Sequence, residues 1–132
     1  MKNTFQIIIT FIIFLEGSSI LIAQGQVAEY RRISPSQAYE MMQEQDDFIL
    51  LDVRTTGEFN QRRIPGSINI SSTEIGNRAE NELPNKEKII LVYCQSGIRS
   101  ESSARILASL GYINVYDFGG IADWPFHTES SR

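Results

Sequence analysis

The sequence is poor in residues that build cross-links and metal sites, because its 132 residues include one cysteine and one histidine. A single cysteine, Cys94, cannot form an internal disulfide, and sites that hold a metal through several Cys or His side chains are excluded as well. The histidine, His127, lies in a polar tail, where a role as catalytic base is not favoured. Cys94 is therefore either apolar filling of the core or a working thiol.

The chain also lacks a run of basic residues, and its formal net charge is -4. A mildly acidic chain gives no electrostatic reason to expect nucleic acid or an anionic membrane surface as a partner. The hydrophobic share of 42% and the charged share of 21% are typical of one globular domain of this length. We expect one domain that uses neither a metal nor another cofactor.

One long hydrophobic run is present, at residues 5–15, and it follows the basic residue Lys2. Small residues that suit a cleavage site come after it, at Ala23 and Gly25. This order is typical of a signal peptide, so we predict that residues 1–25 direct export.

The remaining chain, residues 27–132, is then expected to be a mature domain in the periplasm or outside the cell. The alternative is an uncleaved membrane anchor, because the segment from Asn3 to Ala23 is long enough to cross a bilayer. Gln6 and Glu16 would then lie in hydrocarbon, where a carboxylate is unfavourable. We prefer the signal peptide for that reason.

From residue 27 onward, short apolar runs alternate with amphipathic stretches, a pattern typical of an α/β domain. We predict a central, mainly parallel, five-stranded sheet flanked by helices. The strands are expected at residues 27–33, 48–51, 68–70, 89–93 and 113–116. The tail, residues 117–125, is expected to be a glycine-hinged turn that packs aromatic side chains.

Helix starts are marked by capping patterns, in which a Ser or Thr precedes a Gln or Glu by three residues. Ser34 with Gln37 and Thr55 with Glu58 predict two such starts. Residues 71–74 show the same pattern and predict a third.

The central apolar run ends at Cys94, and a helix expected over residues 99–110 begins at Arg99 and ends before Gly111. Four residues lie between the cysteine and the arginine: Gln95, Ser96, Gly97 and Ile98. In open α/β sheets, ligands bind beyond the carboxyl ends of the strands. If the four residues curl around Cys94, their N–H groups and the positive end of the helix favour the thiolate. We predict that this loop is the active site and that Arg99 holds an anionic substrate group through its fork of donors.

Four other charged residues have less specific interpretations. Asp52 and Arg54 follow the strand expected at residues 48–51, so they reach the same edge of the sheet. A structural ion pair, or a cap on the neighbouring loop, is the role we prefer for Asp52. Arg62 and Arg63 form either a solvated helix end or a patch that attracts anions.

Three stretches of the sequence occur together in one known family. They are residues 51–54 with Glu58, Phe59 and residues 64–69; residues 92–100; and Gly119, Gly120 and Ile121 through Trp124. From about Ser34 to Pro125, the chain resembles a single-domain rhodanese-like sulfurtransferase. It differs at Arg62 and Arg63, where the family more often has Gly-His.

The resemblance implies that Cys94 accepts a sulfane sulfur from a donor such as thiosulfate and becomes a persulfide. The sulfur would then pass to a thiophilic acceptor, which is cyanide, a small thiol or a protein thiol. Arg99 would orient the donor, residues 95–98 would bind the persulfide, and Asp52 and Arg54 would support the site.

Two other functions remain open from the sequence. A small Cys-dependent phosphatase or arsenate-reductase-like enzyme is disfavoured, because such enzymes of this fold have one residue more between Cys and Arg. A non-catalytic rhodanese-like binding module is disfavoured because such modules commonly lack the cysteine, whereas this chain keeps Cys94 and Arg99.

Overall fold

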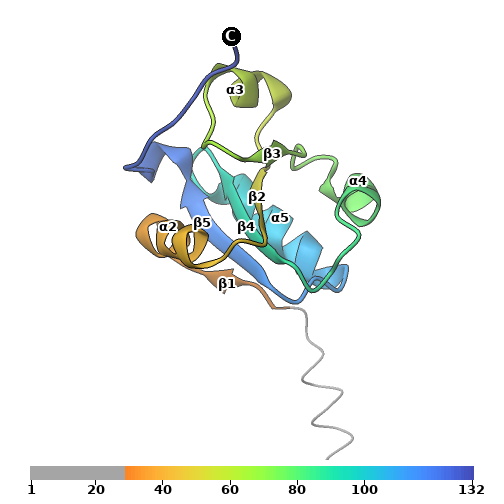
Figure 1. The fold of residues 1–132 in the computed structure, drawn as a ribbon. Coiled ribbons are helices and arrows are strands. Elements are labelled where there is room, and N and C mark those ends of the chain that lie inside the picture. The colour runs from red at the N-terminus through yellow and green to blue at the C-terminus, as the bar shows by residue number, and fades with distance from the viewer. Residues whose placement is uncertain (1–28) are drawn as a thin grey trace, which may run out of the picture.

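The computed structural model describes residues 29–132, and in it five strands form one sheet in the order β1-β5-β4-β2-β3 (Figure 1). Every neighbouring pair of strands runs parallel. The strands are β1 (Arg31–Arg32), β2 (Phe48–Asp52), β3 (Ile68–Asn69), β4 (Ile89–Cys94) and β5 (Val115–Gly120). The predicted five-stranded parallel sheet is confirmed.

Helices cover both faces of this sheet. They are α2 (Pro35–Glu44), α3 (Thr56–Gln61), α4 (Ile75–Glu82) and α5 (Ile98–Ser109), with a short 3-10 helix η1 (Ile121–Asp123) near the end. One core cluster joins α4 and α5 to the sheet, and a second joins α2 and the aromatic side chains of the tail to the opposite face. Figure 1 shows α3 at one end of the sheet.

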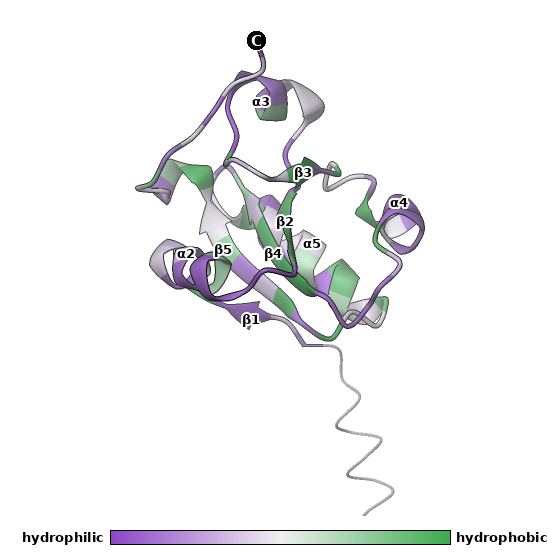
Figure 2. Cartoon of the chain, in the orientation of Figure 1, coloured by the Kyte–Doolittle hydropathy of each residue, from purple (hydrophilic) through white to green (hydrophobic). Residues whose placement is uncertain are grey.

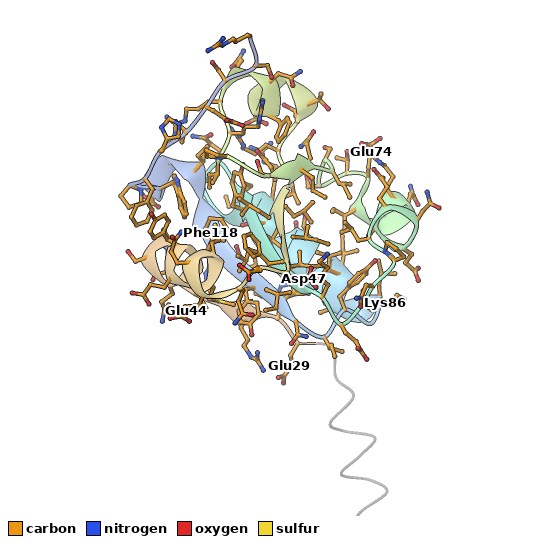
Figure 3. The ribbon with its side chains drawn as sticks, viewed as in Figure 1. Glu29, Glu44, Asp47, Glu74, Lys86 and Phe118 are labelled. Atoms are coloured by element: carbon orange, nitrogen blue, oxygen red, sulfur yellow. The ribbon has the colours of Figure 1, made fainter. Side chains whose placement is uncertain are left out.

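Side chains of β4 alternate between the two clusters, as the pleat of a strand requires. Val92 and Cys94 belong to the cluster under α4 and α5, whereas Leu91 and Tyr93 belong to the cluster under α2. Figure 2 shows this central part of the sheet as the most hydrophobic. In Figure 3, Phe118 lies between α2 and the sheet, and it is 2% exposed. The cysteine therefore lies at the end of the most buried strand.

Two predicted capping boxes are confirmed. The Ser34 hydroxyl accepts the Gln37 N–H at 3.1 Å while the Gln37 side chain accepts the Ser34 N–H at 2.8 Å. Thr55 and Glu58 form the same reciprocal pair at the start of α3.

A third helix does follow residues 71–74, as predicted, but the capping contact expected there is wrong. Helix α4 begins only at Ile75, and no side chain caps it. The Ser71 hydroxyl lies 3.3 Å from the Thr73 hydroxyl, and the Ser72 N–H donates to the Val53 carbonyl. Tertiary contact with the end of β2 therefore holds this segment as a turn.

The last strand also differs from its prediction. It begins at Val115 and extends to Gly120, so residues 117–120 belong to the sheet and the turn comes later, at η1. Asp117 still pairs with Val92, and after an irregularity in β4 Gly120 pairs with Cys94. The two glycines bend the strand rather than end it, because Gly119 has a φ of +86°.

Other boundaries shift by a few residues. Helix α5 begins at Ile98 and ends at Ser109, and Gly111 follows with a φ of +96°, as predicted for a residue that ends a helix. The described part of the first expected strand is limited to Arg31–Arg32. The predicted signal peptide, residues 1–25, lies outside the described residues. Between residues 29 and 132, none of the helices has both the length and the hydrophobicity to cross a membrane.

Candidate active site

The cysteine loop joins β4 to α5 as predicted. Gly97 caps α5 with a φ of +104°, a conformation that side chains disfavour, and its N–H donates to Cys94 Sγ at 3.0 Å. Cys94 is 1% exposed and belongs to the core cluster under α4 and α5. The thiol is buried, as expected for a residue that fills the core, and it is also hydrogen-bonded, as expected for a working thiol.

Opposing effects act on the acidity of this thiol. Burial raises the pKa of Cys94, but hydrogen bonds from the hydroxyl and N–H of Ser100 and from the N–H groups of Gly97 and Ser96 outweigh it. The pKa of Cys94 is therefore lowered from its ordinary value. Donors that favour a buried thiolate make Cys94 suited to nucleophilic attack.

Loop residues contribute in different ways. Ser96 and Gly97 supply N–H groups to the sulfur, whereas the Gln95 carbonyl accepts the N–H of Ala122 at 3.2 Å. Gln95, Ser96 and Ile98 are exposed, and Ile98 reaches 78%. The backbone of the loop therefore surrounds the sulfur while these three side chains face solvent.

The guanidinium of Arg99 is already hydrogen-bonded within the protein. Its Nη1 donates to Glu58 Oε2 at 2.8 Å, and its Nη2 donates to Glu58 Oε1 at 2.9 Å. These hydrogen bonds lower the pKa of Glu58 to about 2, and they raise the pKa of Arg99. The negative charge of a Cys94 thiolate also contributes to raising the pKa of Arg99. Arg99 is thus a fixed cation beside the loop, with further N–H groups left for a ligand.

Glu58 is the site residue that sequence reasoning missed. The capping pattern with Thr55 explains Glu58 completely at the local level, and the structure confirms that contact. The pairing with Arg99 spans 41 residues, so no local pattern predicts it. Its place in the first family motif was the one available signal.

Asp52 and Arg54 form a buried ion pair at the end of β2. Arg54 Nη2 donates to Asp52 Oδ2 at 2.7 Å, and the side chains are 3% and 0% exposed. Burial by itself lowers the pKa of Arg54, but hydrogen bonding and the charge of Asp52 raise it overall. Arg54 Nη2 also donates to the carbonyl of Arg62. The pair therefore ties β2 to the end of α3, which is the structural role preferred for Asp52.

The residues that depart from the family pattern attach α3 to the tail. Arg62 Nη2 donates to the carbonyl of Ile121 at 3.2 Å, and Arg63 Nε donates to Glu129 at 3.2 Å. These contacts favour a structural role over an anion patch.

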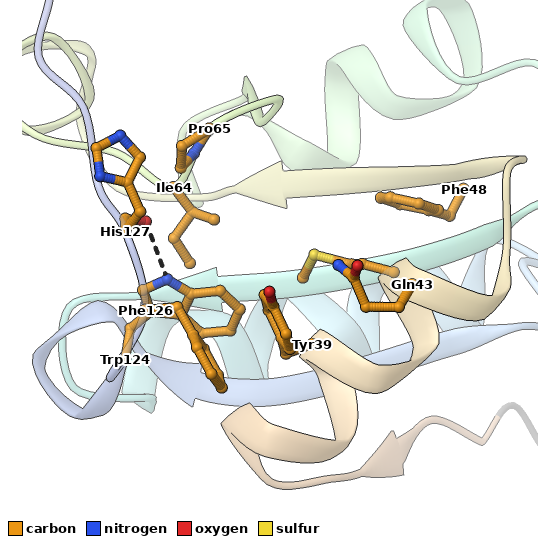
Figure 4. A pocket seen from close by; sticks show the side chains of 9 residues that line it. Tyr39, Gln43, Phe48, Ile64, Pro65, Trp124, Phe126 and His127 are labelled. Atoms are coloured by element: carbon orange, nitrogen blue, oxygen red, sulfur yellow. Dashed lines mark hydrogen bonds between the residues drawn. The ribbon is translucent and has the colours of Figure 1, made fainter.

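An apolar cavity of about 400 Å³ lies between α2 and the tail (Figure 4). Its lining consists of Tyr39, Met42, Gln43, Phe48, Ile64, Pro65, Trp124, Phe126 and His127. None of these residues belongs to the loop of Cys94. The His127 carbonyl accepts the indole N–H of Trp124 at 3.3 Å, and His127 lies beside the cavity and not beside the thiol. Within residues 29–132, no three His, Cys, Asp or Glu side chains gather in a cluster that could hold a metal ion.

Comparison with known proteins identifies similar sequences. Residues 34–125 match the family described as Rhodanese-like domain. The chain is 32% identical over 103 residues to the thiosulfate sulfurtransferase GlpE of Coxiella burnetii, covering 77% of this chain and 94% of that protein. It is 34% identical over 73 residues to the thiosulfate sulfurtransferase PspE of Escherichia coli, covering 55% and 70%.

Solved structures show the same fold. A rhodanese with anions from E. coli matches with a TM-score of 0.58 and 30% identity, covering 62% of this chain and 96% of that chain. A rhodanese-related protein from Thermoplasma volcanium matches with a TM-score of 0.66 and 29% identity, covering 76% and 98%.

Proposed function

The chain belongs to the rhodanese-like family, and on that premise we propose that it transfers a sulfane sulfur from thiosulfate, or a similar donor, through a persulfide on Cys94. One observation carries the proposal. The sulfur of Cys94 is enclosed by a loop that donates a backbone N–H to it at 3.0 Å, and the pKa of this thiol is lowered despite burial. The relatives named thiosulfate sulfurtransferases support thiosulfate as the donor.

The reaction has two displacement steps. The Cys94 thiolate attacks the outer sulfur of thiosulfate, a new S–S bond forms, and the S–S bond of the donor breaks as sulfite leaves with the electron pair. The terminal sulfur of the persulfide then carries the negative charge, which the N–H groups of the loop stabilise. A thiolate or cyanide attacks that terminal sulfur, takes it away and regenerates the Cys94 thiolate. Neither step needs an added oxidant, reductant or general base.

Arg99 contributes charge at a fixed position. Because the Glu58 carboxylate accepts hydrogen bonds from both Nη atoms of the guanidinium, Arg99 keeps one orientation next to the loop while its remaining N–H groups can bind oxygens of the donor. Glu58 thus becomes a positioning residue for Arg99. The four-residue spacing between Cys94 and Arg99 also favours sulfur transfer over phosphate chemistry.

Intact mass spectrometry tests the proposal. Protein treated with thiosulfate and then desalted should gain the mass of one sulfur atom, and cyanide should remove it with release of thiocyanate. Cys94→Ala is the matched control, because the chain has no other thiol. An unchanged mass for the wild type, or the same gain on Cys94→Ala, would contradict the proposal. Hydrolysis of an aryl phosphate without sulfur transfer would support the phosphatase alternative.

We also propose that the domain works outside the cytoplasm, on the basis of the signal-peptide pattern in residues 1–25. Its acceptor is then a small thiol or a protein thiol of that compartment. Fractionation of expressing cells, followed by N-terminal sequencing, tests this. A mature N-terminus near Ala23 or Gly25 in the exported fraction is expected, and full-length protein confined to the cytoplasm would overturn it.

A further inference from the structure

The end of β5 and the start of η1, residues 119–122, pack closely against the backbone of the cysteine loop. A Cβ atom placed on Gly120 would lie 2.1 Å from the Gln95 carbonyl oxygen, so the two backbones touch without room for a side chain. A Cβ atom on Gly97 would lie 3.4 Å from Cα of Gly119. The Gln95 carbonyl also accepts the N–H of Ala122. The path of the loop around Cys94 therefore depends on where residues 119–122 lie.

The side chain of Asp117 stabilises the bend of β5 at Gly119. Its Oδ1 accepts the N–H of Gly119 at 2.9 Å, a turn-forming contact that Asp makes to the residue two positions on. Gly119 has a φ of +86°, and its carbonyl accepts the Ser100 hydroxyl at 3.3 Å. Ser100 also lies close enough to Cys94 for its backbone N–H to help lower the pKa of the thiol. A continuous series of contacts thus leads from Asp117 to the sulfur.

This carboxylate lies in an unfavourable environment. Asp117 is 0% exposed, and its Oδ2 has no hydrogen-bond partner among the described residues. The hydroxyl of Ser103, buried on α5, has none there either. Burying an unpaired polar oxygen costs free energy, and an apolar residue would suit the interior of a strand better. Such a residue is characteristic of a site where function overrides stability.

We propose that Asp117 is a positioning residue that holds the Gly119–Gly120 bend against the cysteine loop and so maintains the donors that surround Cys94. The proposal goes beyond sulfur transfer, because it concerns the shape of the loop and holds for any donor. Two other roles would give different results. A purely structural Asp117 would leave the thiol unchanged when replaced, and an Asp117 that acted only through its charge would make the thiol more acidic when neutralised.

The test measures the pKa of Cys94 from the ultraviolet absorbance of its thiolate as a function of pH, with Cys94→Ala as the blank. Asp117→Val has a shape that suits a strand but cannot accept the Gly119 N–H, so we expect the pKa of the thiol to rise by about one unit. Asp117→Asn retains the acceptor and should stay close to the wild type. Ser103→Ala, which removes the other unpartnered oxygen, is the matched control and should leave the pKa unchanged.

A second variant covers the case in which Asp117→Val does not fold. Gly119→Ala adds a methyl group into open space but strains the positive φ, so it disturbs the same bend by another route. It should also raise the pKa of Cys94. A wild-type pKa in Asp117→Val or in Gly119→Ala, a lowered pKa in both Asp117 variants, or an equal rise in Asp117→Asn would each overturn the proposal. The thiol titration requires no sulfur donor, so its failure is distinguishable from failure of the proposed function.

Discussion

Two arginines of this domain each donate hydrogen bonds from two nitrogens to one carboxylate, but the two pairs differ in burial. Arg54 and Asp52 are 3% and 0% exposed, and their pair joins β2 to the end of α3. Arg99 and Glu58 are 35% and 31% exposed, and their pair joins the first turn of α5 to α3 beside the cysteine loop. The same chemistry therefore builds the scaffold in one place and fixes a charge at the candidate active site in the other.

Burial determines what each pair does for stability. Removing one partner of a buried ion pair strongly destabilises the protein, because the other charge stays buried without compensation. A partly exposed pair contributes little, because water screens and replaces it. We therefore expect changes at Asp52 to act on folding and changes at Arg99 or Glu58 to act on chemistry.

The largest effect is expected for Asp52→Ala. Arg54 would remain buried without its partner, so the free energy of unfolding should fall by about 3–5 kcal/mol. Urea denaturation followed by circular dichroism measures this loss. In the double variant Asp52→Leu with Arg54→Met, which leaves no unpaired charge, much of the stability should return. A loss below about 1 kcal/mol in Asp52→Ala would place this pair in the same class as the exposed one.

Arg99→Lys should separate chemistry from folding. The positive charge is kept but the bidentate geometry with Glu58 is lost, so sulfur loading from thiosulfate should slow about tenfold while stability changes by less than about 1 kcal/mol. Loading is measured by intact mass against time. Arg105→Lys is the matched control, because Arg105 lies on the same helix and pairs with Glu101 on the exposed surface. Equal loading rates in the two variants would remove Arg99 from the site.

The contrast between the two pairs also shows how far the sequence could lead. Asp52 and Arg54 lie two positions apart in one motif, so a pairing between them can be predicted from the sequence, and the preferred structural role agrees with the geometry. The loop of Cys94 was predictable because a β-branched run, a glycine and a helix start follow one another in the chain. The family, the parallel α/β fold and the class of rhodanese-type sulfurtransferase were predicted correctly from these motifs.

Features that arise between distant segments could not be predicted. Glu58 already had a complete local explanation as a capping residue, so its pairing with Arg99 was hidden. Two consecutive glycines, Gly119 and Gly120, are typical of a turn that ends a strand, yet pairing with β4 keeps them in the sheet. Periodicity records the conformation that a segment prefers, whereas these contacts depend on which segments the fold brings together.

Glu58→Gln should change the role of Arg99 without removing it. Gln retains a side-chain oxygen for the cap with Thr55, so folding is preserved, but the guanidinium is no longer held by a carboxylate. The released Arg99 should bind an anionic donor more tightly in a less fixed orientation, so that KM and the maximal rate both fall, by about twofold to threefold. Steady-state kinetics with thiosulfate and cyanide measures both parameters. A rise in maximal rate would show that Glu58 only competes with the donor for Arg99.

The smallest effect concerns pH, and it follows from the lowered pKa of Glu58. Hydrogen bonding with Arg99 places that pKa at about 2 in the folded protein, below the ordinary value of 4.5. A carboxylate with a lowered folded pKa stabilises the fold above its unfolded pKa and loses that contribution as the pH falls through the folded value. The contribution of the pair to stability should therefore be complete at neutral pH and be lost between about pH 4.5 and 2, whereas within the folded protein Glu58 should stay ionised and paired until the pH approaches 2. The carboxyl carbon shift of Glu58, followed by NMR, measures the midpoint, and Arg99→Ala should return it towards 4.5. A wild-type midpoint near 4.5 would mean that Glu58 does not hold Arg99 in solution. The two arginines would then differ in how often each is paired with its carboxylate, as well as in burial.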